Sequence, residues 1–152
     1  MKKPLVSILI SSYNKGNYLE ECLNSCLNQS YSNCEIILLD NYSNDKTIKI
    51  LKEFSKKVKI LKKRKVSKFP SLNQIDLLIK AYKKSKGSII CLLDADDYYH
   101  VQKIEKIKKI FSLKKNINVV FDLPIIKKKN KKIKFKLKKK ITERYLANNY
   151  SD

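Results

Sequence analysis

The sequence predicts an α/β protein with a mostly parallel sheet and flanking helices. Apolar, strand-like runs alternate with helix-like segments along most of the chain, and this alternation is typical of parallel strands joined by helical crossovers. Residues 89–93 form a continuous apolar run of the kind found in strands that are buried on both faces. Three of the predicted strands end in polar clusters, which is where open, Rossmann-like sheets bind their ligands.

Three strands and two helices are predicted in the N-terminal part of the chain. The strands are residues 5–10, 34–39 and 58–61. The first helix begins at Asn17, which can cap it together with Glu20, and its apolar residues repeat at i, i+3 and i+4. The second helix begins near residue 44. Its apolar residues are Ile48, Leu51 and Phe54.

The next helix follows a basic loop. It is predicted to begin at Ser71, in a capping-box pattern, and to end at Gly87, because a glycine commonly terminates a helix. Its predicted buried residues are Leu72, Ile75, Leu78, Ile79 and Tyr82. A strand over residues 88–93 then leads into Asp94-Ala95-Asp96-Asp97. Beyond it, a helix over 101–111, strands over 118–121 and 132–138, and a short helix from Ile141 are predicted.

The chain is strongly basic, with a net charge of +21, and lysine supplies nearly all of the basic residues. Two interpretations stay open: the composition of an AT-rich genome, or a preference for anionic partners such as membrane lipid, nucleotide or nucleic acid. No run reaches the length of a membrane span, and no signal peptide is recognisable. Four cysteines lie in apolar patterns, so reduced core thiols and a cytoplasmic location are expected.

The acidic cluster at residues 94–97 is a candidate metal site. Carboxylates this close repel one another unless a cation or hydrogen-bond donors lie between them, and a divalent cation with its phosphates would serve. The alternative is a solvated acidic turn. Two more polar clusters, at residues 11–14 and 40–45, follow the first and second strands. If these strands are parallel neighbours, all three clusters face one crevice, which favours a nucleotide site.

Three blocks of the sequence resemble the signatures of family 2 glycosyltransferases. They are the segment VSILISSYN with the following helix at 6–31, the segment EIILLDNYSNDKT at 35–47, and the segment from KGSI to LDADD at 86–97. The resemblance implies a GT-A fold, here C-terminally truncated. It also implies a single domain over residues 1–152, with the nucleotide-binding half at 1–100 and the start of the acceptor half at 101–152.

The same resemblance implies roles for individual residues. Asp96 and Asp94 would bind Mn²⁺ or Mg²⁺ on the diphosphate, with Asp94 near the ribose, and Asp97 would support the metal or orient the sugar. Asp40 would hydrogen-bond the base. The residues expected to contact the nucleotide sugar are Ser11, Ser12, Tyr13, Asn14, Asp40, Asn73, Asp94 and Asp97. Lys65 and Lys68 also fall where the family often places donor contacts.

The sequence departs from the family pattern at two positions. The usual Pro-Thr after the first strand is Ser11-Ser12, and the usual Asp-Gly after Asp40 is Asn41-Tyr42. Losing that glycine constrains the loop, and a tyrosine there could cover the base. The short segment after Asp97 holds no carboxylate in a matching motif, so the general base that an inverting transferase needs is expected to be absent.

The predicted function is metal-assisted, inverting transfer from a nucleotide-diphospho-sugar, with a UDP-sugar expected, to a saccharide or a lipid-linked glycan of the cell envelope. The lysines between residues 127 and 140 are expected to allow peripheral membrane contact, against the alternative of a solvated strand face. Other functions stay open: a catalytically incomplete nucleotide-sugar-binding fragment, a sugar nucleotidyltransferase, or a basic nucleic-acid-binding module. The last is not favoured, because carboxylates repel phosphate backbones and no nucleic-acid motif is recognisable.

Overall fold

The computed structural model describes residues 3–64, 67–114, 116–122, 125–128 and 131–134, with only the backbone for 127–128 and 131–134. The chain forms two compact units, Met1–Asn116 and Ile117–Asp152, and each is described by itself. The boundary predicted at residue 100 falls inside the first unit. The prediction of a single domain stays a prediction.

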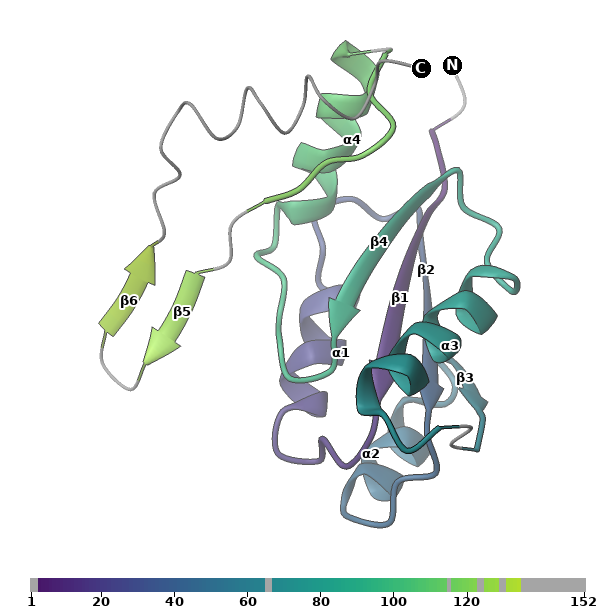
Figure 1. Ribbon diagram of the computed structural model, residues 1–152. Coiled ribbons are helices and arrows are strands. Elements are labelled where there is room, and N and C mark those ends of the chain that lie inside the picture. Colours follow the sequence, from purple (N-terminus) through teal and green to yellow (C-terminus); the bar gives the residue numbers. More distant parts are fainter. Residues whose placement is uncertain (1–2, 65–66, 115, 123–124, 129–130, 135–152) are drawn as a thin grey trace. The chain divides into compact units, whose positions relative to one another are not determined.

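The first unit is an α/β fold around a four-stranded parallel sheet, as predicted (Figure 1). The strand order is β3-β2-β1-β4. The strands are β1 (Val6–Ser12), β2 (Cys34–Asp40), β3 (Lys59–Lys62) and β4 (Ile89–Asp94). The helices are α1 (Leu19–Leu27), α2 (Thr47–Phe54), α3 (Pro70–Tyr82) and α4 (Lys103–Leu113).

A core lies on each face of the sheet, which explains why its central strand β1 is largely apolar. The prediction that β4 is buried on both faces is wrong, because β4 is an edge strand and its Leu92 is 59% exposed. β1 is buried along its whole length. On one face, Ile8 and Ile10 belong to a core cluster that includes residues of α1, α2 and α4. On the other face, Leu77 and Ala81 of α3 pack with Leu9 and with apolar residues of β2. The residues of one strand thus alternate between two cores, so few positions are left for polar side chains before the strand ends.

The buried face of α3 differs from the predicted one. The side chains of Leu72, Ile75, Ile79 and Tyr82 are at least half exposed. The buried residues are Asn73, Leu77 and Ala81, and Leu78 is partly buried. Two apolar stripes overlap on this helix, and spacing alone does not choose between them. The sheet selects the stripe with the smaller Ala81, because a small side chain lets the helix approach the strands closely.

The predicted helix caps are also wrong, since neither α1 nor α3 has a side-chain cap. Tyr18 is the N-cap of α1, and Asn17 lies in the turn before it. α3 begins at Pro70, whose ring suits the first turn of a helix, and Ser71 lies inside it. In α2, Ile50 is buried whereas Ile48 is exposed.

Gly87 does not terminate a helix. α3 ends at Tyr82, and no glycine in the described part of the chain has a positive φ. Gly87 instead lies against β1, where a Cβ atom would be 2.6 Å from the backbone nitrogen of Ser7 and 2.9 Å from the carbonyl oxygen of Leu5. The glycine is therefore required by the close approach of two backbones.

Three donors converge on Glu35 at the start of β2. The Ser7 hydroxyl and the backbone N–H groups of Lys86 and Gly87 donate to its Oε1 over 2.6, 2.5 and 3.2 Å. Burial works to raise the pKa of Glu35, but these hydrogen bonds outweigh it and hold the pKa below its ordinary value of 4.5. The carboxylate thus joins the loop before β4 to β1 and β2.

Replacing Glu35 by glutamine is expected to make the free energy of unfolding less dependent on pH in the acidic range. A depressed pKa in the folded state contributes stability above the unfolded pKa, and this contribution is lost as the pH falls through the folded pKa. The loss of unfolding free energy in Glu35→Gln should therefore be largest near neutral pH and shrink between about pH 6 and about pH 3. Urea unfolding across this range checks it. Ser7→Ala, which removes one donor, should show a smaller change, and parallel curves for Glu35→Gln and wild type would contradict the assignment.

The second unit contains a two-stranded antiparallel hairpin, β5 (Ile125–Lys128) and β6 (Lys131–Lys134). The predicted strand over 132–138 is confirmed up to Lys134, and its remaining residues and the predicted helix from Ile141 lie outside the described residues. No strand forms over 118–121. Within the described ranges, no helix combines the length and apolar character that a bilayer span requires.

Candidate functional site

The carboxyl ends of β1, β2 and β4 lie side by side, and residues at or directly after these ends line one cavity. In the parallel register, Ser11 pairs with Asp94 and Ser12 pairs with Asp40. The cavity has a volume of about 460 Å³, within the range of small-molecule sites. Its lining residues are Ser11, Ser12, Tyr13, Lys15, Asn41, Pro70, Asn73, Gln74, Leu77, Asp94, Ala95 and Asp96. The three polar clusters predicted to share a crevice are therefore neighbours in space.

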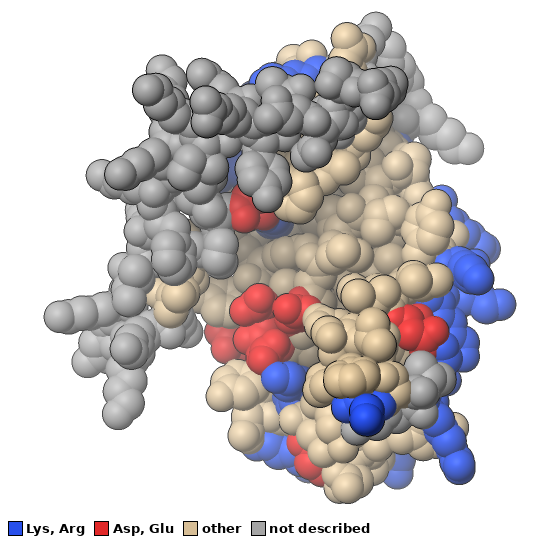
Figure 2. Space-filling view, viewed as in Figure 1, with Lys and Arg blue, Asp and Glu red and all other residues tan. Residues whose placement is uncertain are grey.

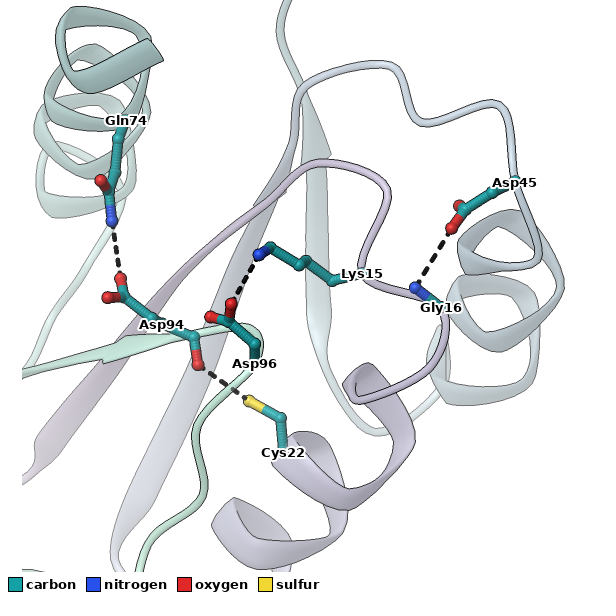
Figure 3. Close-up of polar contacts among 7 residues, drawn as sticks. All are labelled: Lys15, Gly16, Cys22, Asp45, Gln74, Asp94 and Asp96. Carbon is teal, nitrogen blue, oxygen red and sulfur yellow. Dashed lines mark hydrogen bonds and ion pairs between the residues drawn. The ribbon is translucent and has the colours of Figure 1, made fainter. Parts of the chain in front are cut away.

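Two carboxylates stand at the edge of this cavity, on the last residue of β4 and in the turn that follows (Figure 3). Asp94 Oδ1 accepts a hydrogen bond of 2.6 Å from Gln74 Nε2 of α3. Asp96 Oδ2 accepts one of 2.5 Å from Lys15 Nζ. Figure 2 shows acidic side chains gathered in a patch on this face, whereas basic side chains lie mainly along its edges. Donors from two other elements thus offset the repulsion between these carboxylates.

The charges in this cluster shift one another's pKa values. Burial, followed by the nearby Asp96 and Asp94, raises the pKa of Asp97, and Lys15 opposes this shift. The hydrogen bond to Asp96 raises the pKa of Lys15, against a smaller effect of burial. The negative charges of Asp94 and Asp96 contribute to both shifts, so an added cation would be favourable beside them.

Asp40 is the last residue of β2 and is not among the residues that line the cavity. Its side chain is 1% exposed, and its two oxygens accept hydrogen bonds of 2.9 and 2.5 Å from the backbone N–H and hydroxyl of Ser43. The Ser43 hydroxyl in turn accepts from the backbone N–H of Asn14 over 2.9 Å. Asn14 and Tyr42 have φ angles of 50° and 54°, so both loops make left-handed turns.

The positive φ of Tyr42 explains why the sequence pattern prefers glycine there, since glycine adopts this conformation without steric cost. Tyr42 is half exposed, and the Arg64 guanidinium lies 5.4 Å from its ring centroid. Asn14 supports the same pair of loops, because its Oδ1 accepts a 3.0 Å hydrogen bond from the backbone N–H of Asn44. Asn14 and Asp97, like Asp40, are adjacent in sequence to lining residues but do not line the cavity themselves.

Two polar atoms of the cavity lining are buried without a hydrogen-bond partner among the described residues. They are Ser12 Oγ and Asn41 Oδ1, and these residues lie on neighbouring strand ends, where the Asn41 N–H donates to the Ser12 carbonyl over 2.9 Å. A buried polar atom left unpaired costs about 1–3 kcal/mol, and such atoms are rare in folded proteins. Both atoms therefore have unused hydrogen-bonding capacity beside the cavity.

Asn73 joins the lining from the first turn of α3. It is 4% exposed, and its side chain accepts from the Ser67 N–H over 2.9 Å and donates to the Ser67 carbonyl over 2.7 Å. This pair of bonds fixes the loop that leads into the helix. Lys68 is not a lining residue, and its ammonium lies 5.5 Å from the Phe69 ring centroid. Lys65 lies outside the described residues.

The predicted list of contact residues missed three polar residues of the cavity, namely Lys15, Asn41 and Gln74. Asn41 lies within the predicted polar cluster 40–45 but was given no role, and Lys15 directly follows the cluster 11–14, so extending that cluster by one residue would have found it. Gln74 carried no such signal, because its pattern indicated a helix cap and only the packing of α3 brings it to Asp94.

Comparison with known proteins supports a shared ancestry. The family model described as Glycosyl transferase family 2 matches residues 7–151. A protein of Haemophilus influenzae named as an uncharacterized glycosyltransferase is 39% identical over 111 residues, which cover 70% of this chain and 42% of that protein. The chain thus spans less than half of the length of this relative.

Two solved structures share the fold. S. aureus TarS 1-349 in complex with UDP-GlcNAc superposes with a TM-score of 0.60 at 22% identity, over 72% of this chain and 31% of TarS. The mannosyltransferase PcManGT of Pyrobaculum calidifontis, in complex with GDP-Man and Mn²⁺, gives 0.52 at 19% identity, over 65% and 29%. Both likenesses confirm the predicted GT-A fold.

Proposed function

Because this chain belongs to glycosyl transferase family 2, we propose that it binds a nucleotide-diphospho-sugar, with UDP as the nucleotide, in the cavity at the carboxyl ends of β1, β2 and β4. The observation that supports this most directly is the pair of unpartnered buried atoms, Ser12 Oγ and Asn41 Oδ1. The side-chain oxygen Oδ1 of Asn41 is an acceptor suited to the imide N–H of uracil, and the Ser12 hydroxyl can donate or accept. The TarS complex holds UDP-GlcNAc, which agrees with this choice.

The rest of the nucleotide has matching surfaces in the cavity. Tyr13 lines it and is half exposed, so its ring offers a face on which the base stacks. Ser11 and Asn73 present polar groups nearby. Asp40 acts on the base indirectly in this proposal, because it fixes the loop that carries Asn41 and both of its carboxylate oxygens are bonded to Ser43.

Asp94 and Asp96 are proposed to hold a divalent cation, Mn²⁺ or Mg²⁺, with Asp97 supporting them. Among the described residues, no three His, Cys, Asp or Glu side chains are arranged to hold a metal ion. The two carboxylates of Asp94 and Asp96 fit a cation that takes its remaining ligands from phosphates and water, as Mg²⁺ commonly does. When bound, the metal would act as a Lewis acid that stabilises charge on the departing diphosphate.

Sugar transfer by the whole protein, to a saccharide or lipid-linked acceptor, is part of the same proposal. An inverting reaction needs a carboxylate base beside the acceptor hydroxyl, and no residue of the described cavity is assigned to that role. The chain itself supplies donor binding: Asn41 and Ser12 orient the base, and the β4 turn carries the diphosphate end. The predicted membrane contact of lysines 127–140 stays a prediction, since their side chains lie outside the described part.

Isothermal titration with UDP, with and without MnCl₂, tests the proposal. Wild type should bind UDP more tightly with Mn²⁺, and Asp96→Asn should weaken this metal-supported binding at least about tenfold, or about 1.4 kcal/mol, because one anionic ligand is lost. Asn41→Ala should weaken UDP binding but spare binding of Mn²⁺-pyrophosphate, which has no base.

The matched control is Glu53→Gln, which removes one negative charge from the exposed surface of α2. Its UDP affinity should equal that of wild type. If wild type binds no UDP in either buffer, the proposed function is wrong. If it instead binds single-stranded RNA with a steep salt dependence, the nucleic-acid alternative replaces it.

A further inference from the structure

The Lys15 side chain extends from the loop after β1 to Asp96 in the turn after β4 (Figure 3). Its ammonium is 2.5 Å from Asp96 Oδ2, although the two residues are far apart in sequence. Resting on the proposed function, we propose that Lys15 is a resident counter-ion: it neutralises Asp96 in the empty site and transfers to the diphosphate when the nucleotide and metal bind.

The backbone around Lys15 is held in place, which leaves the side chain as the moving part. On one side, the Asn14 N–H donates to Ser43 Oγ over 2.9 Å. On the other, the Gly16 N–H donates to Asp45 Oδ2 over 3.2 Å. At Gly16, a Cβ atom would also be 2.8 Å from the Thr47 backbone nitrogen. The loop is thus anchored to the segment after β2 on both sides of the lysine.

The strength of the pair suits an exchangeable contact. The Lys15 and Asp96 side chains are 38% and 42% exposed, and ion pairs at such sites are weak because water screens them. A buried ion pair would be hard to separate, because moving one partner away would leave the other charge buried and unpaired. An exposed pair lets the ammonium leave Asp96 at little cost, provided that another anion receives it.

Lys15 lines the cavity in which the diphosphate is proposed to bind. The phosphate oxygens of a bound nucleotide would therefore be within reach of its ammonium as hydrogen-bond acceptors. A divalent cation and an ammonium compete for the same Asp96 oxygen, so the lysine weakens metal binding to the empty site. Phosphate oxygens accept charge-assisted hydrogen bonds from lysine, so the displaced ammonium strengthens nucleotide binding. Lys15 therefore makes metal and nucleotide binding mutually dependent, and this coupling is reciprocal.

Mn²⁺ titrations followed by electron paramagnetic resonance of the free ion test this directly. In the absence of UDP, Lys15→Met should bind Mn²⁺ about fivefold more tightly than wild type, the ratio that corresponds to a surface ion pair of about 1 kcal/mol. In the absence of metal, the same variant should bind UDP about fivefold more weakly. The ratio of Mn²⁺ affinities with and without UDP should fall accordingly.

Three controls separate this role from a merely structural one. Lys15→Arg keeps the charge and should retain the coupling. Lys49→Met removes an exposed positive charge from α2 and should change none of the affinities. In an Asp96→Asn background, Lys15→Met should no longer raise Mn²⁺ affinity.

An unchanged or weaker Mn²⁺ affinity in Lys15→Met would overturn the inference. The Mn²⁺ titration without nucleotide does not require UDP binding, so it reports on Lys15 even if wild type binds no UDP and the proposed function fails.

Discussion

Replacing Gly87 by alanine is expected to lower the free energy of unfolding by about 1–3 kcal/mol, the typical cost of overpacking. The added Cβ would be 2.5 Å from Ser7 Oγ, 2.6 Å from the Ser7 backbone nitrogen and 2.9 Å from the Leu5 carbonyl oxygen. Two of these atoms are backbone atoms beside or within β1, which is buried between two helical layers and cannot retreat. Urea denaturation with circular dichroism measures the change.

Two further variants show whether the backbone contact is the cause. Ser88→Ala alters the neighbouring exposed residue and should change stability by less than about 0.5 kcal/mol. Combining Gly87→Ala with Ser7→Ala removes only the hydroxyl contact, so the alanine should remain strongly destabilising. A Gly87→Ala protein as stable as wild type would mean that the loop before β4 moves away from β1 freely.

The second large effect is expected for Asp40→Ala, which should destabilise the fold by about 2–4 kcal/mol because buried donors lose a charged acceptor. The variant leaves the N–H and hydroxyl of Ser43 without the carboxylate that both contact. The Ser43 hydroxyl also accepts from Asn14, so the β1 loop should loosen together with the β2 loop. Denaturant unfolding and UDP titration should both report a loss.

Comparing the two measurements decides how Asp40 acts. If it only fixes the loop, Ser43→Ala should lower both stability and UDP affinity in the same direction, but less. If Asp40 contacted the base directly, as the family resemblance implies, Asp40→Ala would weaken UDP binding while leaving stability unchanged. The burial of Asp40 favours the first result.

The positions of β1, β2 and β4 could be predicted from local patterns because each is a largely apolar run that ends at polar residues. β1, β2 and β4 each begin and end within two residues of the predicted bounds. The convergence of three polar clusters followed from one topological rule, since parallel strands present their carboxyl ends at the same edge. These features depend on residues that are close in sequence.

The lining of the cavity was predicted less well, because it depends on contacts between distant segments. Asp40 and Asn41 are adjacent and both polar, yet Asn41 lines the cavity whereas Asp40 is buried outside its lining. The left-handed turn at Tyr42 and the hydrogen bonds from Ser43 to Asp40 determine which of the two side chains lines the cavity. Neither could be inferred from composition or periodicity.

The amino-acid sequence by itself determined the family, the parallel α/β architecture and the acidic turn after β4, because each rests on a short pattern of residue types. Only the tertiary structure decided which face of α3 meets the sheet, why residue 87 must be glycine, and that Lys15 bonds to Asp96. The physical reason is that these outcomes depend on packing distances and charge contacts between segments that meet only after the chain has folded.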